Sequence, residues 1–306
     1  MKNNKKILII THPGFKIGIQ NVARSLNEFT IDVYSFKDKE WRNRSIFSRF
    51  SLVRKYNIVH FFWGYAKIFD FIIYRLLGNS KIINHFIGTD LYNIIKRSFL
   101  KRTELKLCSY LSNFSCVSSI LSEDLRKINI QSSILPFVNQ NIKKRNLNYP
   151  LENRIMVYLP SERKKFFKHD MLLKLAKEMK DINFTWFPYK KDPNEILPDN
   201  ISTIERIERE NMFNTFNEHK IFIRIPEHDG LPNTILEALS MGRWVIWSYE
   251  MNNVTKVNNY DELYQSVKFM IENPNPNVEG ADFVINNYSF KHICELFNKN
   301  YRELLI

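Results

Sequence analysis

The chain has 306 residues, a length that suggests two domains of ordinary size. Hydrophobic residues make up 44% and charged residues 25% of the sequence, which excludes a disordered or collagen-like chain. The formal net charge of +13 is divided unevenly, because residues 1–150 carry a net +16 and residues 151–306 a net −3, so we expect the first half to face an anionic partner.

Short apolar runs alternate with helix-like segments along the first half of the chain. Each run is almost continuously apolar, which is typical of parallel strands that are buried on both faces. The predicted strands are Lys6–Ile10, Ile31–Ser35, Ile58–Phe62, Lys81–His85 and Phe114–Val117. The predicted helices are Ile19–Leu26, Ile68–Leu77, Leu91–Leu107 and Leu121–Lys127. This alternation predicts an α/β domain with a doubly wound parallel sheet.

A polar segment, residues 139–153, contains Pro150 and has no hydrophobic period, so we predict a linker there. A second α/β series follows it. Its predicted strands and helices are Ile155–Tyr158, Met171–Met179, Asn183–Phe187, Asn211–Phe216, Ile221–Ile225, Thr234–Met241, Trp244–Trp247, Asp261–Glu272 and Phe290–Leu305. We therefore predict an N-terminal domain over residues 1–145 and a C-terminal domain over residues 146–285. We expect a C-terminal helix, within residues 286–306, to pack back toward the N-terminal domain.

Residues 221–247 read IFIRIPEHDGLPNTILEALSMGRWVIW and contain the most informative motif. A predicted strand leads through a loop with Asp229 and Gly230 into a helix that starts near Thr234. The free N–H groups and the dipole of such a helix N-terminus favour an anion. Asp229 and Glu237 stand eight residues apart, so the two carboxylates can hold hydroxyl groups of one polyol ligand while the N–H groups between them hold a phosphate.

Three alternatives concern the acidic residues of this motif. Thr234 and Glu237 also have the spacing of a capping box, in which the glutamate reaches back to the start of the helix. Asp229 also suits a turn before Gly230. Glu227 and Asp229 could form a metal-binding pair, but a glycine loop follows them instead of a second acidic cluster, so we predict no metal site.

The stretch HDGLPNTILEALSMGRWVI resembles the nucleotide-sugar-binding signature of the GT-B glycosyltransferases of family GT4. The matching positions are Asp229, Gly230, Leu231, Glu237, Ala238, Leu239, Gly242, Val245 and Ile246. The resemblance implies a GT-B fold, with two Rossmann-like domains whose parallel sheets face an interdomain cleft. It also implies transfer of a sugar with retention of its anomeric configuration.

By this resemblance, Glu237 holds the ribose hydroxyls of the donor nucleotide, and Asp229 contacts hydroxyls of the transferred sugar. The family usually has glutamate at the Asp229 position, so the shorter side chain leaves the donor sugar open. The donor diphosphate meets backbone N–H groups in the loop and first helical turn, at Gly230, Leu231, Pro232, Asn233 and Thr234 (the proline itself has no N–H group).

Family members also carry an arginine and a lysine after the first strand of the second domain. Arg163 and Lys168 are the best candidates here, with Lys164 and Lys165 as competitors, although a solvated basic loop is an alternative. Fixed cations stabilise the charge that develops on a leaving nucleoside diphosphate. The resemblance therefore implies that the reaction needs the donor substrate but no cofactor and no metal ion.

In the first domain, the strand that ends in His85 is followed by Gly88, Thr89 and Asp90. This pattern resembles the family strand whose histidine reaches the donor sugar, so we predict a functional role for His85 and favour it over His60. Gly14 lies in the loop after the first predicted strand, where this fold lines the cleft. That loop has no GxGxxG pattern, which argues against NAD binding.

Two segments combine cations with large apolar residues: Trp41–Tyr56 and Leu91–Lys106. The second carries Lys96, Arg97, Lys101, Arg102 and Lys106. Basic amphipathic helices of this kind bind anionic bilayers, although ordinary surface helices are an alternative. No RNA-binding signature accompanies the cations, so we expect no nucleic-acid partner.

Together these features predict a glycosyltransferase that moves a hexosyl unit from a nucleotide-diphosphate sugar to a lipid-linked or cell-surface glycan acceptor. A GT-B nucleotide-sugar epimerase and a non-catalytic protein that binds a membrane or a sugar nucleotide are the alternatives. The sequence has no run of 18 uncharged apolar residues, no signal-peptide core and only three scattered cysteines. We therefore expect a cytoplasmic protein at the inner face of the cell membrane.

Overall fold

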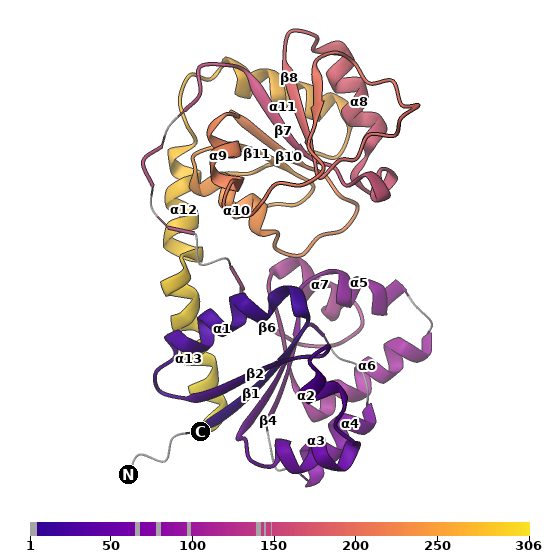
Figure 1. Ribbon diagram of the computed structural model, residues 1–306, viewed down its shortest axis with the longest axis vertical. Coiled ribbons are helices and arrows are strands. Elements are labelled where there is room, and N and C mark those ends of the chain that lie inside the picture. Colours follow the sequence, from indigo (N-terminus) through magenta and orange to yellow (C-terminus); the bar gives the residue numbers. More distant parts are fainter. Residues whose placement is uncertain are drawn as a thin grey trace. The chain divides into compact units, whose positions relative to one another are not determined.

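The computed structural model describes residues 5–64, 68–77, 81–96, 99–138, 142–143, 145–147 and 149–306. Arg97 and parts of the predicted linker lie outside these ranges. The chain divides into two compact units (Figure 1). Unit 1 comprises Met1–Gln140, Asp229–Leu231 and Phe290–Ile306, and unit 2 comprises Asn141–His228 and Pro232–Ser289. Each unit contains a six-stranded sheet whose strands are all parallel, which confirms the predicted α/β class with two parallel sheets.

The sheet of unit 1 has the strand order β2-β1-β3-β4-β5-β6. Its strands are β1 (Lys6–Thr11), β2 (Thr30–Ser35), β3 (Ile58–Phe62), β4 (Lys81–Phe86), β5 (Asn113–Cys116) and β6 (Ser133–Ile134). The five predicted strands are confirmed, with ends that shift by one residue at most. The sequence missed β6, because its two residues are exposed and leave no apolar run.

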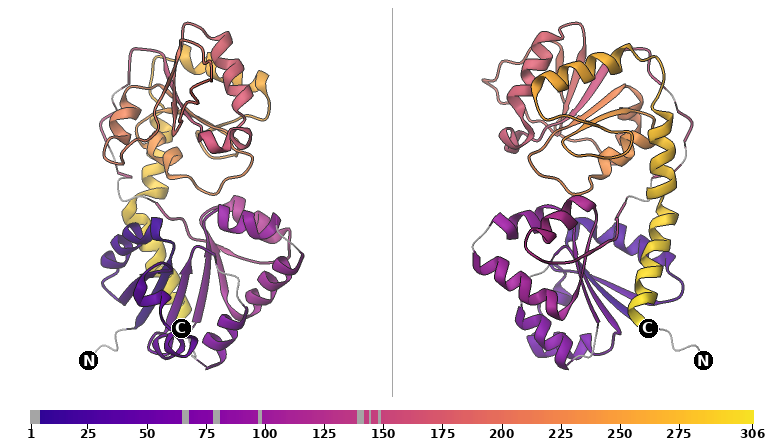
Figure 2. Two further views of the ribbon diagram at one scale, coloured as in Figure 1. Left: turned by 45° about the vertical axis from the view of Figure 1, so that its right-hand side comes forward. Right: turned by 180° about the vertical axis from the view of Figure 1, so that it is seen from behind.

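Helices cover both faces of this sheet, as Figures 1 and 2 show. Successive side chains of β3 point to opposite faces. His60 meets α13 (Phe290–Leu305) on one face, and Phe61 stacks on Phe71 of α4 (Ile68–Ile72) on the other. The other helices of unit 1 are η1 (Pro13–Phe15), α1 (Lys16–Ser25), α2 (Lys39–Arg42), α3 (Ile46–Val53), η2 (Ile73–Leu77), α5 (Thr89–Lys96), α6 (Phe99–Leu111) and α7 (Ser119–Arg126).

The single helix predicted over Leu91–Leu107 is wrong, because two helices, α5 and α6, occupy this part of the chain. Each has its own buried side: Leu91 in α5, and Leu105 with Cys108 in α6. Two short amphipathic helices in succession show a hydrophobic spacing similar to that of one long helix. The hydrophobic period alone therefore does not distinguish two helices from one.

Unit 2 has the strand order β12-β11-β10-β7-β8-β9. The strands are β7 (Arg154–Tyr158), β8 (Asn183–Phe187), β9 (Ile201–Thr203), β10 (Ile221–Arg224), β11 (Trp244–Trp247) and β12 (Thr255–Lys256). The helices are η3 (Ser161–Arg163), η4 (Lys165–Phe167), α8 (His169–Glu178), α9 (Met212–Asn217), α10 (Asn233–Ser240), α11 (Tyr260–Glu272) and α12 (Val278–Tyr288). The sequence missed β9, β12, α12 and the short helices η3 and η4, whereas the other elements of this unit are confirmed within two residues. The core of unit 2 packs Trp186 of β8 and Ile223 of β10 against Leu175 of α8.

The topology of each sheet marks one position where a ligand is expected. In unit 2 the chain runs from β7 outward to β8 and β9, then returns to the other side of β7 as β10. In unit 1 the same reversal falls between β1 and β3. Loops that leave two such strands diverge, and ligands of open α/β sheets bind in the crevice at their carboxyl ends. The loops after β7 and β10 therefore form the candidate ligand position of unit 2.

Candidate functional site

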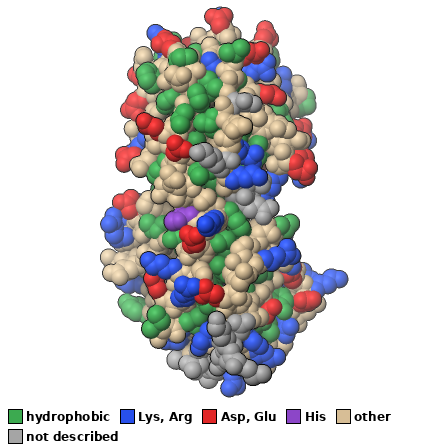
Figure 3. Space-filling model, turned by 90° about the vertical axis from the view of Figure 1, so that its left-hand side faces the viewer, with side chains coloured by type: hydrophobic (Ala, Val, Ile, Leu, Met, Phe, Trp, Pro, Cys, Tyr) green, Lys and Arg blue, Asp and Glu red, His purple; other side chains and the backbone are tan. Residues whose placement is uncertain are grey.

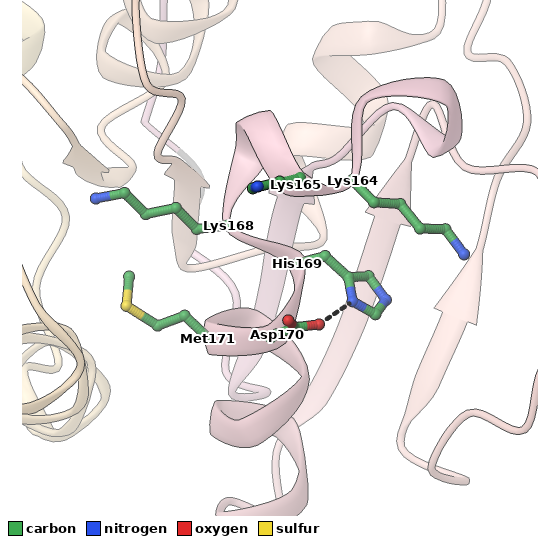
Figure 4. A pocket seen from close by; sticks show the side chains of 6 residues that line it. All are labelled: Lys164, Lys165, Lys168, His169, Asp170 and Met171. Carbon is green, nitrogen blue, oxygen red and sulfur yellow. Dashed lines mark hydrogen bonds and ion pairs between the residues drawn. The ribbon is translucent and has the colours of Figure 1, made fainter.

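A basic pocket of about 520 Å³ follows β7. Its lining residues come from η4, its flanking residues and the first turn of α8: Lys164, Lys165, Lys168, His169, Asp170 and Met171 (Figure 4). In this view Lys168 and Met171 point to one side of the segment, whereas Lys164 and His169 point to the other. Three lysines within one pocket favour an anionic ligand.

The local backbone brings Lys168 to the start of α8. Lys168 is the N-cap residue of this ten-residue helix and has a left-handed conformation, with φ 53° and ψ 44°. A non-glycine residue in this region costs on the order of 1 kcal/mol or more, so the surrounding contacts must hold it there. The ammonium group and the positive end of the helix dipole thus act in the same direction, toward a negative charge.

Lys164 is already engaged by a carboxylate. Its Nζ atom lies 2.6 Å from Glu195 Oε1, which also accepts a hydrogen bond from the Tyr189 hydroxyl at 2.7 Å. Burial lowers the pKa of this ammonium group, but the interactions with Glu195 and Tyr189 together outweigh burial, and the net effect raises its pKa. Within the described parts of the chain, Lys165 and Lys168 have no ion-pair partner. Of the three lysines, these two are better placed to meet a ligand.

Two guanidinium groups lie beside the aromatic side chains of the same edge. Arg163, predicted as a phosphate ligand, has its Cζ atom 3.8 Å from the ring centroid of Phe166. Arg224, the last residue of β10, lies 4.1 Å from the ring centroid of Tyr158. Both guanidinium groups are within 6 Å of the Phe167 ring, at 5.7 and 5.5 Å. Arg224 was not among the candidate residues that the sequence indicated. Its position at the end of a strand, beside the point where the strand order reverses, could have identified it.

The loops after β7 and β10 are joined by a backbone hydrogen bond, in which the Glu227 N–H group donates to the Phe166 carbonyl at 2.9 Å. This bond places the start of the predicted signature next to the basic segment. Both loops leave strands that pair with each other, so they share the carboxyl edge of one sheet.

The N-terminus of α10 differs from the capping box considered above. The helix starts at Asn233, its N-cap residue is Pro232, and no side chain caps it. The buried hydroxyl of Thr234 has no hydrogen-bond partner within the described residues. The capping-box alternative is therefore wrong, because Thr234 already lies inside the first turn. Glu237 lies in the second turn and is only 5% exposed, so its carboxylate is shielded from water.

Asp229, Gly230 and Leu231 are grouped with unit 1, whereas Pro232, Asn233, Thr234 and Glu237 belong to unit 2. The Asp229 Oδ1 atom accepts a hydrogen bond from the Gly230 N–H group at 3.2 Å. This contact reaches the next residue, one position short of the bond to residue i+2 that defines an Asx-turn. Among the described residues, no group of three or more His, Cys, Asp or Glu side chains is arranged to hold a metal ion.

His85 lies near the end of β4 and is fully buried within unit 1. Its Nδ1 atom is 3.1 Å from His60 Nε2, and His60 Nδ1 is 2.8 Å from the Tyr301 hydroxyl oxygen. Tyr301 has no other partner available for its O–H donor among the hydrogen bonds of the described residues. If Tyr301 donates to His60, then His60 donates to His85, and the proton of His85 resides on Nε2.

The sequence indicated His60 and His85 as separate candidates, and the structure joins them with Tyr301 in one buried chain of side chains. The His85 ring is fully buried, and an interaction with the backbone of Leu135 raises its pKa but only partly offsets the effect of burial. Gly14 lies in the loop after β1, beside the point where the strand order of the unit 1 sheet reverses. Its N–H group donates to the Nδ1 atom of His12 at 3.2 Å, and the His12 ring lies 4.9 Å from the ring of Trp63.

Acid is expected to destabilise the protein through these histidines. Burial lowers the pKa of His85 to about 3 and also lowers that of His60, whereas an unfolded histidine titrates near about 6.5. For His85 the unfolded chain thus binds more protons between these values, so stability is lost as the pH falls from about 6.5 toward 3, by about 1.4 kcal/mol per pH unit. His60, whose pKa burial also lowers, adds to the loss in the same direction.

Urea unfolding between about pH 7.5 and about pH 5 measures this loss. His219 in unit 2 also has a pKa that burial lowers, so the test needs a variant that isolates unit 1. His85→Gln should reduce the pH dependence of the unfolding free energy relative to the wild-type chain. An unchanged dependence would show that His85 is already protonated, or exposed, in the folded state.

Comparisons with protein families and with curated proteins found no match to this sequence. Solved structures match over almost the whole chain. Sucrose-phosphate synthase from Thermosynechococcus elongatus is 12% identical with a TM-score of 0.73, and the match covers 98% of this chain and 99% of that one. The lipopolysaccharide outer core galactosyltransferase WaaB, in its apo form, is 12% identical with a TM-score of 0.72, over 97% and 99% of the two chains.

HepE from Anabaena, in complex with UDP and glucose, is 10% identical with a TM-score of 0.68, and the match covers 99% of each chain. These proteins share the arrangement of two α/β domains with parallel sheets. The chain therefore has the GT-B fold that its sequence predicts.

Proposed function

We propose that this chain is a glycosyltransferase that moves a hexosyl unit from a nucleotide-diphosphate sugar to a lipid-linked or cell-surface glycan acceptor, with retention of configuration. The basic pocket at the N-terminus of α8, beside the reversal point of the unit 2 sheet, is the observation that carries the proposal. Proteins of the same fold support it, since HepE is described in complex with UDP and with UDP-glucose.

Different residues of unit 2 bind different parts of the donor. Lys168 and Arg163, with Lys165 nearby, neutralise the diphosphate, and backbone N–H groups at the start of α10 contribute to the same task. Glu237 holds the ribose hydroxyls. By the resemblance, Asp229 holds hydroxyls of the sugar and His85 has a functional role, although the His85 side chain is fully buried within unit 1.

Transfer proceeds on one face of the sugar. The bond between the anomeric carbon and the phosphate oxygen breaks, and the acceptor oxygen bonds to the same face of that carbon. The acceptor proton passes to an oxygen of the leaving diphosphate, whose charge the fixed cations stabilise. We propose that this requires no cofactor and no metal ion.

A panel of nucleoside diphosphates and their sugars, screened by thermal shift, tests the donor site. A true ligand at 100 times its dissociation constant adds about 2.7 kcal/mol to the stability of the folded chain. Glu237→Gln should weaken that ligand about 10- to 100-fold, because a hydrogen bond to a charged group contributes about 1.5–3 kcal/mol. Glu272→Gln, an exposed change at the end of α11, is the matched control.

Release of the nucleoside diphosphate separates the three function classes. A transferase releases it in proportion to added acceptor, an epimerase converts the sugar without an acceptor, and a binding protein does neither. If no member of the panel stabilises the chain, or if Asp229→Ala and Glu237→Ala both retain full transfer while folded, the proposed site is wrong.

We further propose that the protein works at the cytoplasmic side of an anionic membrane as a peripheral protein. None of the helices in the described ranges has the length and apolar character needed to span a bilayer. The exposed outer side of helix α6 in unit 1 is a specific candidate for the membrane-binding surface.

A further inference from the structure

Helix α6 carries an apolar stripe on its outer side. Phe99 is 73% exposed, Leu100 76%, Leu107 48% and Tyr110 75%. The inner side of the same helix is closed by Leu105 and Cys108, which are fully buried in unit 1. The helix is therefore apolar on two sides, and the fold of unit 1 uses only one of them.

The spacing shows that the exposed residues form one stripe. Leu100, Leu107 and Tyr110 are separated by seven and three residues, which correspond to about two turns and one turn of helix. Four large apolar side chains on one side of this helix, with the polar Thr103 between them, are more than the scattered apolar residues of an ordinary surface. Exposed apolar surfaces of this kind mark sites of contact with proteins or membranes.

Cations border this stripe. Arg102 and Lys106 are exposed and have no ion-pair partner within the described residues. The single acidic residue of α6, Glu104, is already paired with Lys101 at 2.5 Å, on the side of α4. The charge next to the stripe is thus positive, and an acidic counterpart is missing from the helix itself.

The neighbouring helices extend the same character. Ile68 at the start of α4 donates its N–H group to Glu104 Oε1 at 3.3 Å, and the next residue, Phe69, is 76% exposed. Phe47 of α3 is 81% exposed, and Figure 1 shows α3, α4 and α6 on the same side of unit 1. Exposed cations close by in the chain are Arg54 and Lys55, which follow α3, Arg75 of η2 and Lys96 of α5, whereas the one charged residue of α4 is the acidic Asp70. By contrast, the unit 1 face turned to the viewer in Figure 3 carries acidic side chains among its basic ones.

We propose that the outer side of α6, together with Phe69 and Phe47, docks onto an anionic lipid bilayer. The helix lies along the surface, the stripe enters the boundary between headgroups and acyl chains, and Arg102 and Lys106 remain at the level of the lipid phosphates. Tyr110 suits the same boundary, since its ring is apolar and its hydroxyl stays hydrated.

This surface overlaps only in part with the two segments indicated by the sequence, Trp41–Tyr56 and Leu91–Lys106. Trp41, the first aromatic residue of the predicted segment Trp41–Tyr56, is only 4% exposed and belongs to the core. The stripe instead continues past Lys106 to Tyr110. Docking onto a bilayer by itself requires no sugar donor. The inference rests on the proposed function in one respect only, namely that membrane docking favours a lipid-linked acceptor over a soluble one.

Vesicle co-sedimentation of the full chain tests the surface, with phosphatidylcholine alone and with phosphatidylcholine mixed with phosphatidylglycerol. We expect binding to the anionic vesicles only, and weaker binding as salt screens the cations. The double variant Arg102→Gln/Lys106→Gln should bind about 30-fold more weakly, or about fivefold for each cation. The triple variant Leu100→Ser/Leu107→Ser/Tyr110→Ser should lose binding by about 100-fold or more.

Two matched controls come from unit 2. Phe269→Ser changes an apolar residue of α11 that is 64% exposed, and Lys177→Gln/Lys180→Gln removes two exposed cations. Both should bind vesicles as the wild-type chain does. Each variant is first shown to unfold at the wild-type temperature and, if a nucleotide stabilises the wild-type chain, to keep that thermal shift.

Three results would overturn the inference. The first is equal binding to neutral and anionic vesicles, and the second is unchanged binding by the stripe variant. The third is a change in molar mass by light scattering when the stripe is altered, since a second copy of the chain would then be its occupant. If vesicle binding depends on the stripe but no nucleotide binds, the surface stands and the proposed transferase function fails.

Discussion

Replacing Lys168 by glutamine is expected to lower the rate of glycosyl transfer by about two to three orders of magnitude. The ammonium group lies in the basic pocket at the start of α8, and no carboxylate of the described residues neutralises it. Charge on the leaving diphosphate grows as the glycosidic bond breaks. The lost interaction is therefore stronger in the transition state than in the bound donor, and kcat should fall more than KM rises.

Two further lysines make this prediction specific. Lys177→Gln removes an exposed cation from the same helix, far from its N-terminus, and should leave transfer unchanged. Lys164→Gln breaks the pair with Glu195 and should lower stability more than it lowers kcat, because this ammonium group is already engaged. If Lys164→Gln abolishes transfer while Lys168→Gln does not, Lys164 is the phosphate ligand and Lys168 is not.

Replacing Asp90 by asparagine is expected to destabilise unit 1 by about 3 kcal/mol or more. The carboxylate, only 5% exposed, accepts backbone N–H groups at 2.7–3.1 Å. The donors are Gly64, Ile87, Gly88 and Leu91. Asparagine retains one acceptor oxygen and turns an amide donor toward other donors, so at least one buried N–H group loses its partner.

Asp90 thereby joins the loop after β3 to the loop after β4, next to the candidate position of unit 1. Burial raises the pKa of this carboxyl group, and the hydrogen bonds from the surrounding N–H groups only partly reverse that effect. Urea unfolding at neutral pH measures the loss of stability. Glu123→Gln is the control in the same unit, since it removes an exposed ion pair with Arg126 and should cost less than about 1 kcal/mol. A similar small cost for Asp90→Asn would show that the loops hold their shape without the carboxylate.

The helices and strands that could be predicted from the sequence are those whose own residues show a clear apolar run or a helical period. The run IVHFF is apolar or aromatic at every position except His60, and it forms β3, which is buried on both faces. The apolar period over Phe290–Leu305 predicted α13 to the residue. Elements with a short or exposed pattern, such as β6 and β12, escaped prediction because pairing with a neighbouring strand defines them.

The candidate site shows a similar division. The signature around Asp229 and Glu237, and the basic segment Arg163–Lys168, could be recognised from residue types and spacing. The spacing of Thr234 and Glu237 suited a capping box, yet the helix begins earlier and the cap does not form. The choice among the basic residues depended on Glu195, which lies 31 residues from Lys164 and binds it.

By itself, the sequence determined the α/β class, the two parallel sheets and the residue types of the proposed donor site, because each follows from local periodicity or from a contiguous motif. Only the tertiary structure decided which lysines are neutralised, that His60, His85 and Tyr301 form one buried chain, and that α6 leaves an apolar side uncovered. Such features depend on side chains distant in sequence, 241 residues apart for His60 and Tyr301, and on which face of an element packing buries. Neither can be read from local spacing, because many partners and orientations are compatible with the same pattern.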